Sequence, residues 1–227
     1  MGSGGSRNTC DLAAERDRVA GLFAIEGEAR AEGHKLIAGV DEVGRGCVGG
    51  PVYAGAVVFA GSPALPGLDD SKALLPEVRE SLAERIRVSA SGAAVGAATA
   101  AEIDALGIVA ATFLAMRRAL DLLRAAGVLP TLVLVDAFRI PGLDSPQRAY
   151  VGGDRRVAAI AAASVVAKVA RDARMDEIGR RFPAYGFESH KGYATPEHLS
   201  ALRRHGPCPE HRLTFDRVVV RRGTKAA

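Results

Sequence analysis

The chain has 227 residues, of which 48% are hydrophobic and 5% aromatic, with no Trp and a net charge of +4. This length and apolar content suffice for the core of one domain, built mostly from Ala, Val, Leu and Ile. The three cysteines are far apart and odd in number, which argues against a disulfide framework and is typical of a reducing cytoplasm. No apolar stretch is long enough to span a bilayer, so we expect no membrane segment.

The N-terminal part of the chain predicts one helix followed by two strands. Residues 1–9 begin Gly/Ser-rich, and we expect a disordered tail there. Apolar residues near helical spacing predict a helix over Asp11–Glu32, which Gly33 ends. Apolar runs predict buried strands at Lys35–Val40 and Pro51–Ala60, and turn-forming residues fill Leu65–Lys72.

The rest of the chain alternates helices and strands before it becomes mostly helical. Listed in order, we expect a helix at Pro76–Ser89, a strand at Ala93–Ala100, helices at Ala101–Leu106 and Ile108–Ala126, a strand at Thr131–Val135, a loop with an edge strand at Pro141–Gly153, and helices at Asp154–Phe182 and Pro196–His205. This order predicts an α/β fold, with a mixed central sheet covered by helices. Residues 10–227 then form one domain whose C-terminal segment, from about 183, is helical.

Acidic residues stand where the predicted strands end and where the long helix begins. Asp41 and Glu42 follow the first strand, Asp136 follows a later strand, and Asp154 opens the long helix. Carboxylate oxygens at such positions are the ligands that Mg²⁺ and Mn²⁺ prefer. Taken singly, each residue is also explained as a helix cap or a turn residue. Neighbours on a regular strand face opposite ways, so Asp41 and Glu42 share a site only if the strand becomes irregular there.

Several carboxylates held together favour phosphodiester hydrolysis. Their mutual repulsion calls for cations, and two cations about 4 Å apart stabilise both the attacking and the leaving oxygen of an in-line displacement. The sequence therefore predicts a metal-dependent nuclease that uses Asp41, Glu42, Asp136 and Asp154.

Basic and glycine-rich features surround these acids. Gly44 and Gly46 permit close approach to a ligand, and Arg45 between them is suited to phosphate. Ser164, Lys168 and Arg171 share an arc of about 60° on the apolar long helix, which is either a phosphate-binding stripe or a solvated edge. His190 and Lys191 with Tyr193 suit contact with a sugar or base, and a Tyr in a small C-terminal core is the alternative.

The ordered combination resembles the type 2 ribonucleases H, the ribonuclease HII family of bacteria. The similarity rests on motifs that follow one another from about Leu36 to Phe215, namely Gly39–Gly46, Asp70-Ser71-Lys72, Val135-Asp136, Gly153-Asp154, Ile160–Asp172, His190–Thr195 and His211-Arg212. The resemblance implies a ribonuclease H-like fold. It also implies hydrolysis of RNA in RNA/DNA hybrids, and incision 5′ of single ribonucleotides embedded in duplex DNA, with two Mg²⁺ or Mn²⁺ ions.

The resemblance also assigns roles to residues. Asp41, Glu42, Asp136 and Asp154 take the metal-binding roles. The remaining assignments concern substrate: Gly44, Arg45 and Gly46 read the ribose 2′-hydroxyl, Tyr193 packs on the deoxyribose at an RNA–DNA junction, and Lys72, Ser164 and Lys168 contact the backbone. The 2′-hydroxyl is what distinguishes RNA from DNA at one nucleotide. We expect a cytoplasmic monomer, and no protein partner is evident.

The sequence departs from the family pattern at three positions. Gly152 stands where Lys is usual, Val43 where Ala is frequent, and Cys208 where Ser is commoner. Loss of a cation at Gly152 is expected to weaken phosphate binding unless Arg155 or Arg156 offsets it. Two other functions compete: a type 3 ribonuclease H, which carries a substantial N-terminal substrate-binding domain, and a non-catalytic nucleic-acid-binding module. A phosphotransferase would need a longer Gly-rich loop.

Overall fold

The computed structural model describes residues 5–69, 71 and 74–218. Among them lies a five-stranded sheet in the order β3-β2-β1-β4-β5. β1 pairs antiparallel with β2 and parallel with β4, so the sheet is mixed. The strands are β1 (Ile37–Val43), β2 (Val52–Phe59), β3 (Gly92–Ala98), β4 (Leu132–Asp136) and β5 (Gln147–Tyr150). The predicted α/β fold with a mixed central sheet is confirmed, including the short edge strand.

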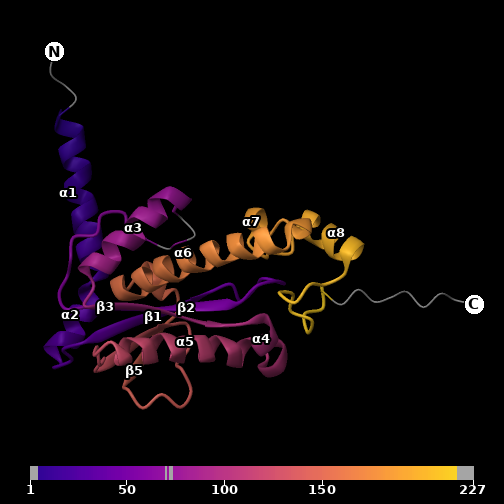
Figure 1. The fold of residues 1–227 in the computed structure, drawn as a ribbon. Helices are drawn as coiled ribbons and strands as arrows, with labels where there is room; N and C mark the ends of the chain where they lie inside the picture. Colours follow the sequence, from indigo (N-terminus) through magenta and orange to yellow (C-terminus); the bar gives the residue numbers. More distant parts are fainter. Residues whose placement is uncertain (1–4, 70, 72–73, 219–227) are drawn as a thin grey trace, which may run out of the picture.

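Helices cover both faces of the sheet. Figure 1 shows α3 (Pro76–Ser89) and α6 (Ala158–Arg181) on one face, and α4 (Ala100–Leu106) and α5 (Ile108–Ala125) on the other. The core therefore forms two apolar layers, one between α6 and the sheet and one between α5 and the sheet. Small side chains let α6 lie very close to the strands. A Cβ on Gly39 would come 2.0 Å from the backbone of Ala159, too close for any side chain.

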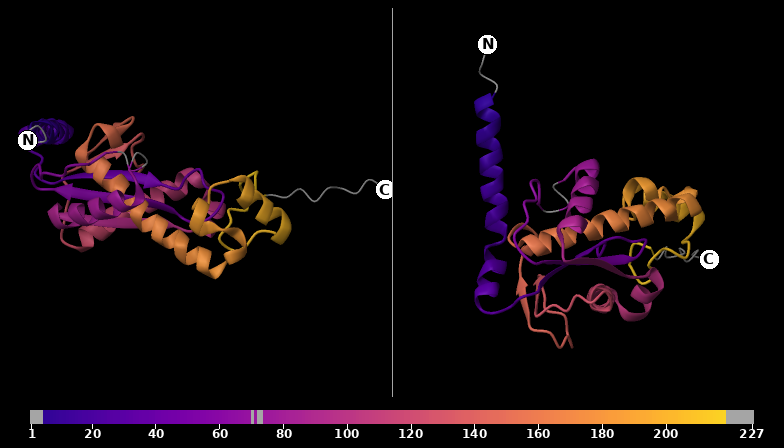
Figure 2. Two further views of the ribbon diagram at one scale, coloured as in Figure 1. Left: turned by 90° about the horizontal axis from the view of Figure 1, so that it is seen from above. Right: turned by 60° about the vertical axis from the view of Figure 1, so that its left-hand side comes forward.

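The N-terminal helix differs from the prediction in two ways. α1 (Gly5–Leu22) and α2 (Ala24–Ala31) replace one long helix, because the chain turns at Phe23, whose buried ring packs edge-on against Phe59 at 5.6 Å. α1 also begins at Gly5, inside the segment 1–9 for which the sequence predicts a tail. Its N-terminal end extends away from the sheet (Figure 2), where each added residue closes its own helical hydrogen bond.

The segment after α6 folds back on the end of that helix. The C-terminal segment from about 183, which the sequence predicts to be helical, begins with a short 3-10 helix η2 (Pro183–Tyr185) and a one-turn helix α7 (Phe187–His190), followed by α8 (Pro196–His205). Tyr185, Phe187 and Leu202 bury their side chains against Met175 of α6 and form a small separate core. Within the described residues, no helix is long and apolar enough to cross a membrane.

Candidate active site

Three of the four predicted carboxylates meet at the edge where β1 and β4 end. The two strands run parallel with Val40 opposite Val135, so the next residues, Asp41 and Asp136, lie side by side. Asp41, Glu42 and Asp136 each offer an oxygen, and these oxygens lie within 4.8 Å of one another. The parallel register is therefore what brings acids almost 100 positions apart into one site.

Asp41 and Glu42 share the site although β1 stays regular there, so the condition that the strand become irregular is wrong. β1 stays paired with β2 through both residues and on to Val43, which faces Tyr53. Only the pairing with β4 ends, after Val40. Glu42 nevertheless reaches the cluster, because its side chain has one more methylene than Asp and the strand edge beside it is no longer covered by β4.

The cluster carries a strong electrostatic cost. Burial raises the pKa of Asp41 well above its usual value, and the charges of Glu42 and Asp136 raise it further. Burial also raises the pKa of Glu42, although Arg45 opposes that shift. A hard divalent cation would replace the missing solvation and remove the repulsion between the acids. The donor set, made only of carboxylate oxygens, fits Mg²⁺ or Mn²⁺.

Asp154 lies next to this cluster but on a separate element. It sits in a 3-10 helix, η1 (Gly153–Arg155), and is buried. α6 begins only at Ala158, with Val157 at its cap position, so the prediction that Asp154 opens the long helix is wrong. The connection to the cluster runs through Gly153, whose backbone N–H donates to Asp136 Oδ1 at 2.7 Å.

Gly152, which stands where the family usually has Lys, adopts a backbone conformation that favours glycine. Gly152 adopts φ +65° and ψ +37°, in the left-handed region, at the start of η1. Glycine enters this region without the steric cost that a side chain brings. The tight turn from β5 into η1 is therefore favoured by the same residue that departs from the family pattern.

Gly44, Arg45 and Gly46 form a turn directly beside the acids. Gly44 has φ +91°, and a Cβ there would lie 2.1 Å from Nε of Arg171, so only glycine fits. Arg45 donates from Nη1 to Glu42 Oε1 at 3.3 Å, while its side chain remains partly exposed. The turn thus places the positively charged Arg45 side chain beside the carboxylates. The backbone of the turn also lies close to them.

Two buried arginines hold this turn and the loop that follows it. Arg212 is fully buried and donates to the carbonyl oxygens of Gly44, Arg45, Cys47 and Gly50 over 2.6–3.0 Å. Its own burial lowers the pKa of its guanidinium to about 10.

Arg171, equally buried, donates to the carbonyls of Pro51, Lys191 and Gly49. It is therefore a structural clamp rather than part of a solvated edge. Sequence reasoning placed Arg171 on a polar stripe and Arg212 in a motif, but gave neither this role. An arginine inside an apolar helix face was the available signal.

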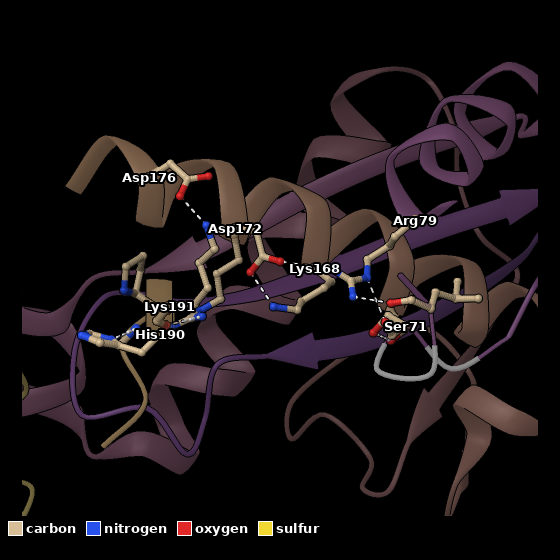
Figure 3. A network of polar contacts seen from close by, with 12 residues as sticks. Ser71, Arg79, Lys168, Asp172, Asp176, His190 and Lys191 are labelled. Carbon is tan, nitrogen blue, oxygen red and sulfur yellow. Dashed lines mark hydrogen bonds and ion pairs between the residues drawn. The ribbon is translucent and has the colours of Figure 1, made fainter. Parts of the chain in front are cut away.

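Ser164 lies at the cluster, and Lys168 lies away from it. Ser164 is buried, hydrogen-bonds to Asp41, and shares a 2.7 Å hydrogen bond with Ser71. Lys168 pairs with Asp172, which also receives Arg79 Nη1 at 3.2 Å. Figure 3 shows this network running along α6 toward Ser71, whose carbonyl accepts from Arg79.

Lys72, the remaining predicted backbone contact, lies outside the described residues. Of the basic pair before Tyr193, Lys191 forms an ion pair with Asp176 and His190 hydrogen-bonds to Tyr185.

Tyr193 lies on the turn between α7 and α8, and the residue is 45% exposed. The turn is attached to the loop that follows Gly46, because the carbonyl of Gly192 accepts from the backbone N–H groups of Val48 and Gly49. The structure thereby brings the two predicted substrate-reading elements, the Gly44–Gly46 turn and Tyr193, onto one connected surface.

Comparison with known proteins agrees with this geometry. The family model described as Ribonuclease HII matches residues 38–218. The chain belongs to the ribonuclease HII family. It is 52% identical over 180 residues to Ribonuclease HII of a Polaromonas species, covering 79% of this chain and 89% of the relative. It is 47% identical over 201 residues to Ribonuclease HII of Desulfitobacterium hafniense, covering 88% and 76%. As a member of this family, the chain is a ribonuclease H that hydrolyses RNA as an endonuclease.

Solved structures share the fold. The ribonuclease HII in a PCNA complex from Archaeoglobus fulgidus has a TM-score of 0.67 at 26% identity, over 79% of this chain and 95% of that chain. Bst-RNase HIII in complex with Mn²⁺ has a TM-score of 0.62 at 19% identity, over 81% and 68%. The second likeness shows the fold alone, so family membership rests on the ribonuclease HII matches. Ribonucleases H use divalent metal ions, and the carboxylate cluster is where this chain can hold them.

Proposed function

We propose that Asp41, Glu42, Asp136 and Asp154 hold two divalent cations over the scissile phosphate of an RNA/DNA hybrid or of a duplex with one embedded ribonucleotide. The observation that carries the proposal is the meeting of three carboxylates from β1 and β4 at one strand edge. Asp154 supplies the fourth ligand from η1, which Gly153 joins to Asp136. Two cations held by these residues would supply activation of the attacking water and charge stabilisation at the leaving 3′-oxygen.

The protein's own residues set the ligand geometry. Asp41 and Asp136, which lie side by side on two paired strands, would both contribute oxygens to the cations. Ser164 fixes the orientation of the Asp41 carboxylate by hydrogen bonding, and Ser71 holds Ser164 in turn. Arg45 holds Glu42 and leaves part of its guanidinium exposed for the phosphate. Lys168 and Lys72 are carried over from the family resemblance as contacts to the nucleic-acid backbone.

Substrate selection is assigned to the connected surface beside the acids. Backbone groups of the Gly44–Gly46 turn read the 2′-hydroxyl, because glycine lets the chain approach the ribose closely. The exposed Tyr193 ring packs on the neighbouring deoxyribose and fits a ribose poorly. Together they favour the phosphate 5′ of a ribonucleotide that is followed by DNA.

A cleavage assay on two substrates tests this proposal. A duplex containing one ribonucleotide and a uniform RNA/DNA hybrid are incubated with the protein in Mg²⁺ and, separately, in Mn²⁺. We expect metal-dependent incision of both, with the single-ribonucleotide duplex cut 5′ of the ribonucleotide. Cleavage of the hybrid alone would instead favour type 3 specificity, and binding without cleavage in either metal would favour the non-catalytic module.

The proposal also covers the oligomeric state of the enzyme and the compartment in which it works. We propose that it acts as a monomer in the cytoplasm, where Cys47 and Cys208, both buried and unpaired by disulfides, stay reduced. Light scattering of the purified protein tests the first point. A particle mass near twice the 23.6 kDa of one chain would contradict the monomer.

A further inference from the structure

Three histidines gather directly behind Tyr193. The rings of His190 and His198 stack with centroids 4.1 Å apart and an interplanar angle of 13°. His198 Nε2 lies 3.0 Å from His211 Nε2. His198 and His211 are almost completely buried, at 0% and 1% exposure. Such a group could be a metal site, a charged cluster or a neutral hydrogen-bonded network.

The shorter hydrogen bonds fix the arrangement of protons, because the alternative, donation from His211 Nδ1 to the Cys208 carbonyl at 3.3 Å, would set that N–H against the N–H of Cys208. The carbonyl of Tyr193 can only accept, so His198 Nδ1, at 2.8 Å, carries a proton and donates. The backbone N–H of Cys208 donates to His211 Nδ1 at 2.9 Å, so that nitrogen is an acceptor. In the bond between the two rings, His211 Nε2–H then donates and His198 Nε2 accepts. Both rings are neutral, and burial accordingly lowers each pKa to about 4.

His190, which precedes Tyr193 in the chain, follows the same rule. Its Nδ1 accepts from the backbone N–H of Gly192 at 3.1 Å, so its Nε2–H donates to the carbonyl of Tyr185 at 2.7 Å. Every ring nitrogen of the three histidines therefore has a protein partner. The cluster has no lone pair left for a metal ion, and a charged ring would lose one of these bonds.

The network acts on the backbone of Tyr193. The Tyr193 carbonyl accepts from both His198 Nδ1 and the backbone N–H of Thr195, and the Tyr193 N–H donates to the carbonyl of His190. The preceding Gly192 bonds to Val48 and Gly49 of the loop behind the Gly44–Gly46 turn. Tyr193 is thus held at both of its peptide groups, at a fixed distance from the turn that faces the carboxylates.

We infer that His198, set in its tautomer by His211, is a positioning residue that determines how strongly the enzyme prefers an RNA–DNA junction. The inference rests on the proposed role of Tyr193 at that junction. His198 touches no substrate. It orients the peptide that carries the Tyr193 ring, and the ring must meet a deoxyribose while the 2′-hydroxyl is read at the neighbouring turn.

Two amide substitutions separate the two bonds of His198. In His198→Asn, the side-chain amide takes the place of Nδ1 and can still donate to the Tyr193 carbonyl. In His198→Gln, the longer amide takes the place of Nε2, keeps the contact with His211 and loses the Tyr193 carbonyl. The measured quantity is the ratio of kcat/KM on a single-ribonucleotide duplex to kcat/KM on a uniform RNA/DNA hybrid, for both variants and for Tyr193→Ala.

We expect His198→Gln to lower this ratio by about three- to tenfold, the effect of one hydrogen bond. His198→Asn should keep the ratio within about twofold of wild type. An unchanged ratio in His198→Gln, or an equal fall in both variants, would overturn the inference. A defect of folding alone lowers cleavage of both substrates together and leaves the ratio unchanged, so it also counts against a positioning role.

Tyr193→Ala tests the proposed role of Tyr193 at the junction separately from the inferred role of His198. If the tyrosine packs on the junction sugar, this variant lowers the ratio by about tenfold, as loss of one stacking contact does. An unchanged ratio in Tyr193→Ala would remove the proposed role of the tyrosine itself. A fall in Tyr193→Ala with no effect of His198→Gln would remove only the role of the histidine.

Discussion

The carboxylate cluster and the Tyr193 region lie beside each other but are stabilised in opposite ways. Asp41, Glu42 and Asp136 are held together by the parallel register of β1 and β4 against their mutual repulsion, which raises the pKa of Asp41. The Tyr193 region consists of the turn over 191–195 and the loop over 44–51 that is bonded to it. Here neutral histidines and buried arginines satisfy the backbone carbonyls. The first region would be completed by a cation from solution, whereas the polar groups of the second find their partners within the protein.

This difference predicts which perturbations each region tolerates. The cluster should gain folding stability when a carboxylate is neutralised, although it then loses its chemistry. The Tyr193 region should lose stability whenever a donor or acceptor is removed, because a buried polar group without a partner costs about 1–3 kcal/mol. The following experiments separate the two behaviours.

The largest effect is expected from Asp41→Asn. Metal-dependent cleavage should fall by more than about 100-fold, because even loss of an outer partner of a metal ligand costs about 10–100-fold. Asp136→Asn should behave similarly, and Asp144→Asn, an exposed residue of the β4–β5 loop, serves as the matched control. Near-normal cleavage by both cluster variants would remove the proposed metal site.

The same variant should be more stable than wild type in the absence of metal. The raised pKa of Asp41 means that the folded state binds a proton more tightly than the unfolded state does. Stability is therefore lost as pH rises above the unfolded pKa, and the asparagine removes this loss. Urea unfolding in a chelator at pH 5 and pH 8 measures it. If Asp41→Asn were less stable than wild type at pH 8, repulsion between the carboxylates would not destabilise the folded protein.

Arg212→Gln should cause the largest loss of stability. It removes the guanidinium that donates to the carbonyls of Gly44, Arg45, Cys47 and Gly50 in a buried loop. We expect a decrease of about 3 kcal/mol or more in the free energy of unfolding. Arg204→Gln, on the exposed face of α8, is the control and should change stability by less than about 0.5 kcal/mol. Equal effects would mean that Arg212 is not a clamp.

Acidification should weaken the Tyr193 region through its histidines. Their pKa values, lowered to about 4, lie below the usual 6.5, so the unfolded state takes up protons first. The stability that they contribute is complete above pH 6.5 and is lost as pH falls toward 4. We expect His198→Asn to lose about 2 kcal/mol less than wild type over this interval in urea unfolding. The comparison cancels the opposite trend of Asp41.

The smallest effect is expected at Gly152. Gly152→Ala places a side chain at φ +65° and should cost about 1 kcal/mol of stability. Gly61→Ala, with open space around its Cβ and no positive φ, is the control. Thermal unfolding of both variants measures the difference. A Gly152→Ala protein as stable as its control would show that the turn does not require glycine.

The sequence by itself determined the fold class and the chemical types at the site. Hydrophobic periodicity predicted the helices and most strands, because each element needs one apolar face or a fully apolar core. The four acids were found because the sequence predicts them at strand ends and at a helix start. The ordered family motifs around the acids then identified the chemistry. Taken alone, Asp154 was equally well explained as a helix cap.

Tertiary structure decided what depends on contacts between distant segments. The register of β1 against β4 determined that Asp41 meets Asp136, and no local pattern encodes a register across almost 100 residues. The start of α6 at Ala158 moved Asp154 into η1. Arg171 and Arg212 hold the loops together because buried backbone carbonyls there need donors. The protonation of His198 follows from the Tyr193 carbonyl, which can only accept.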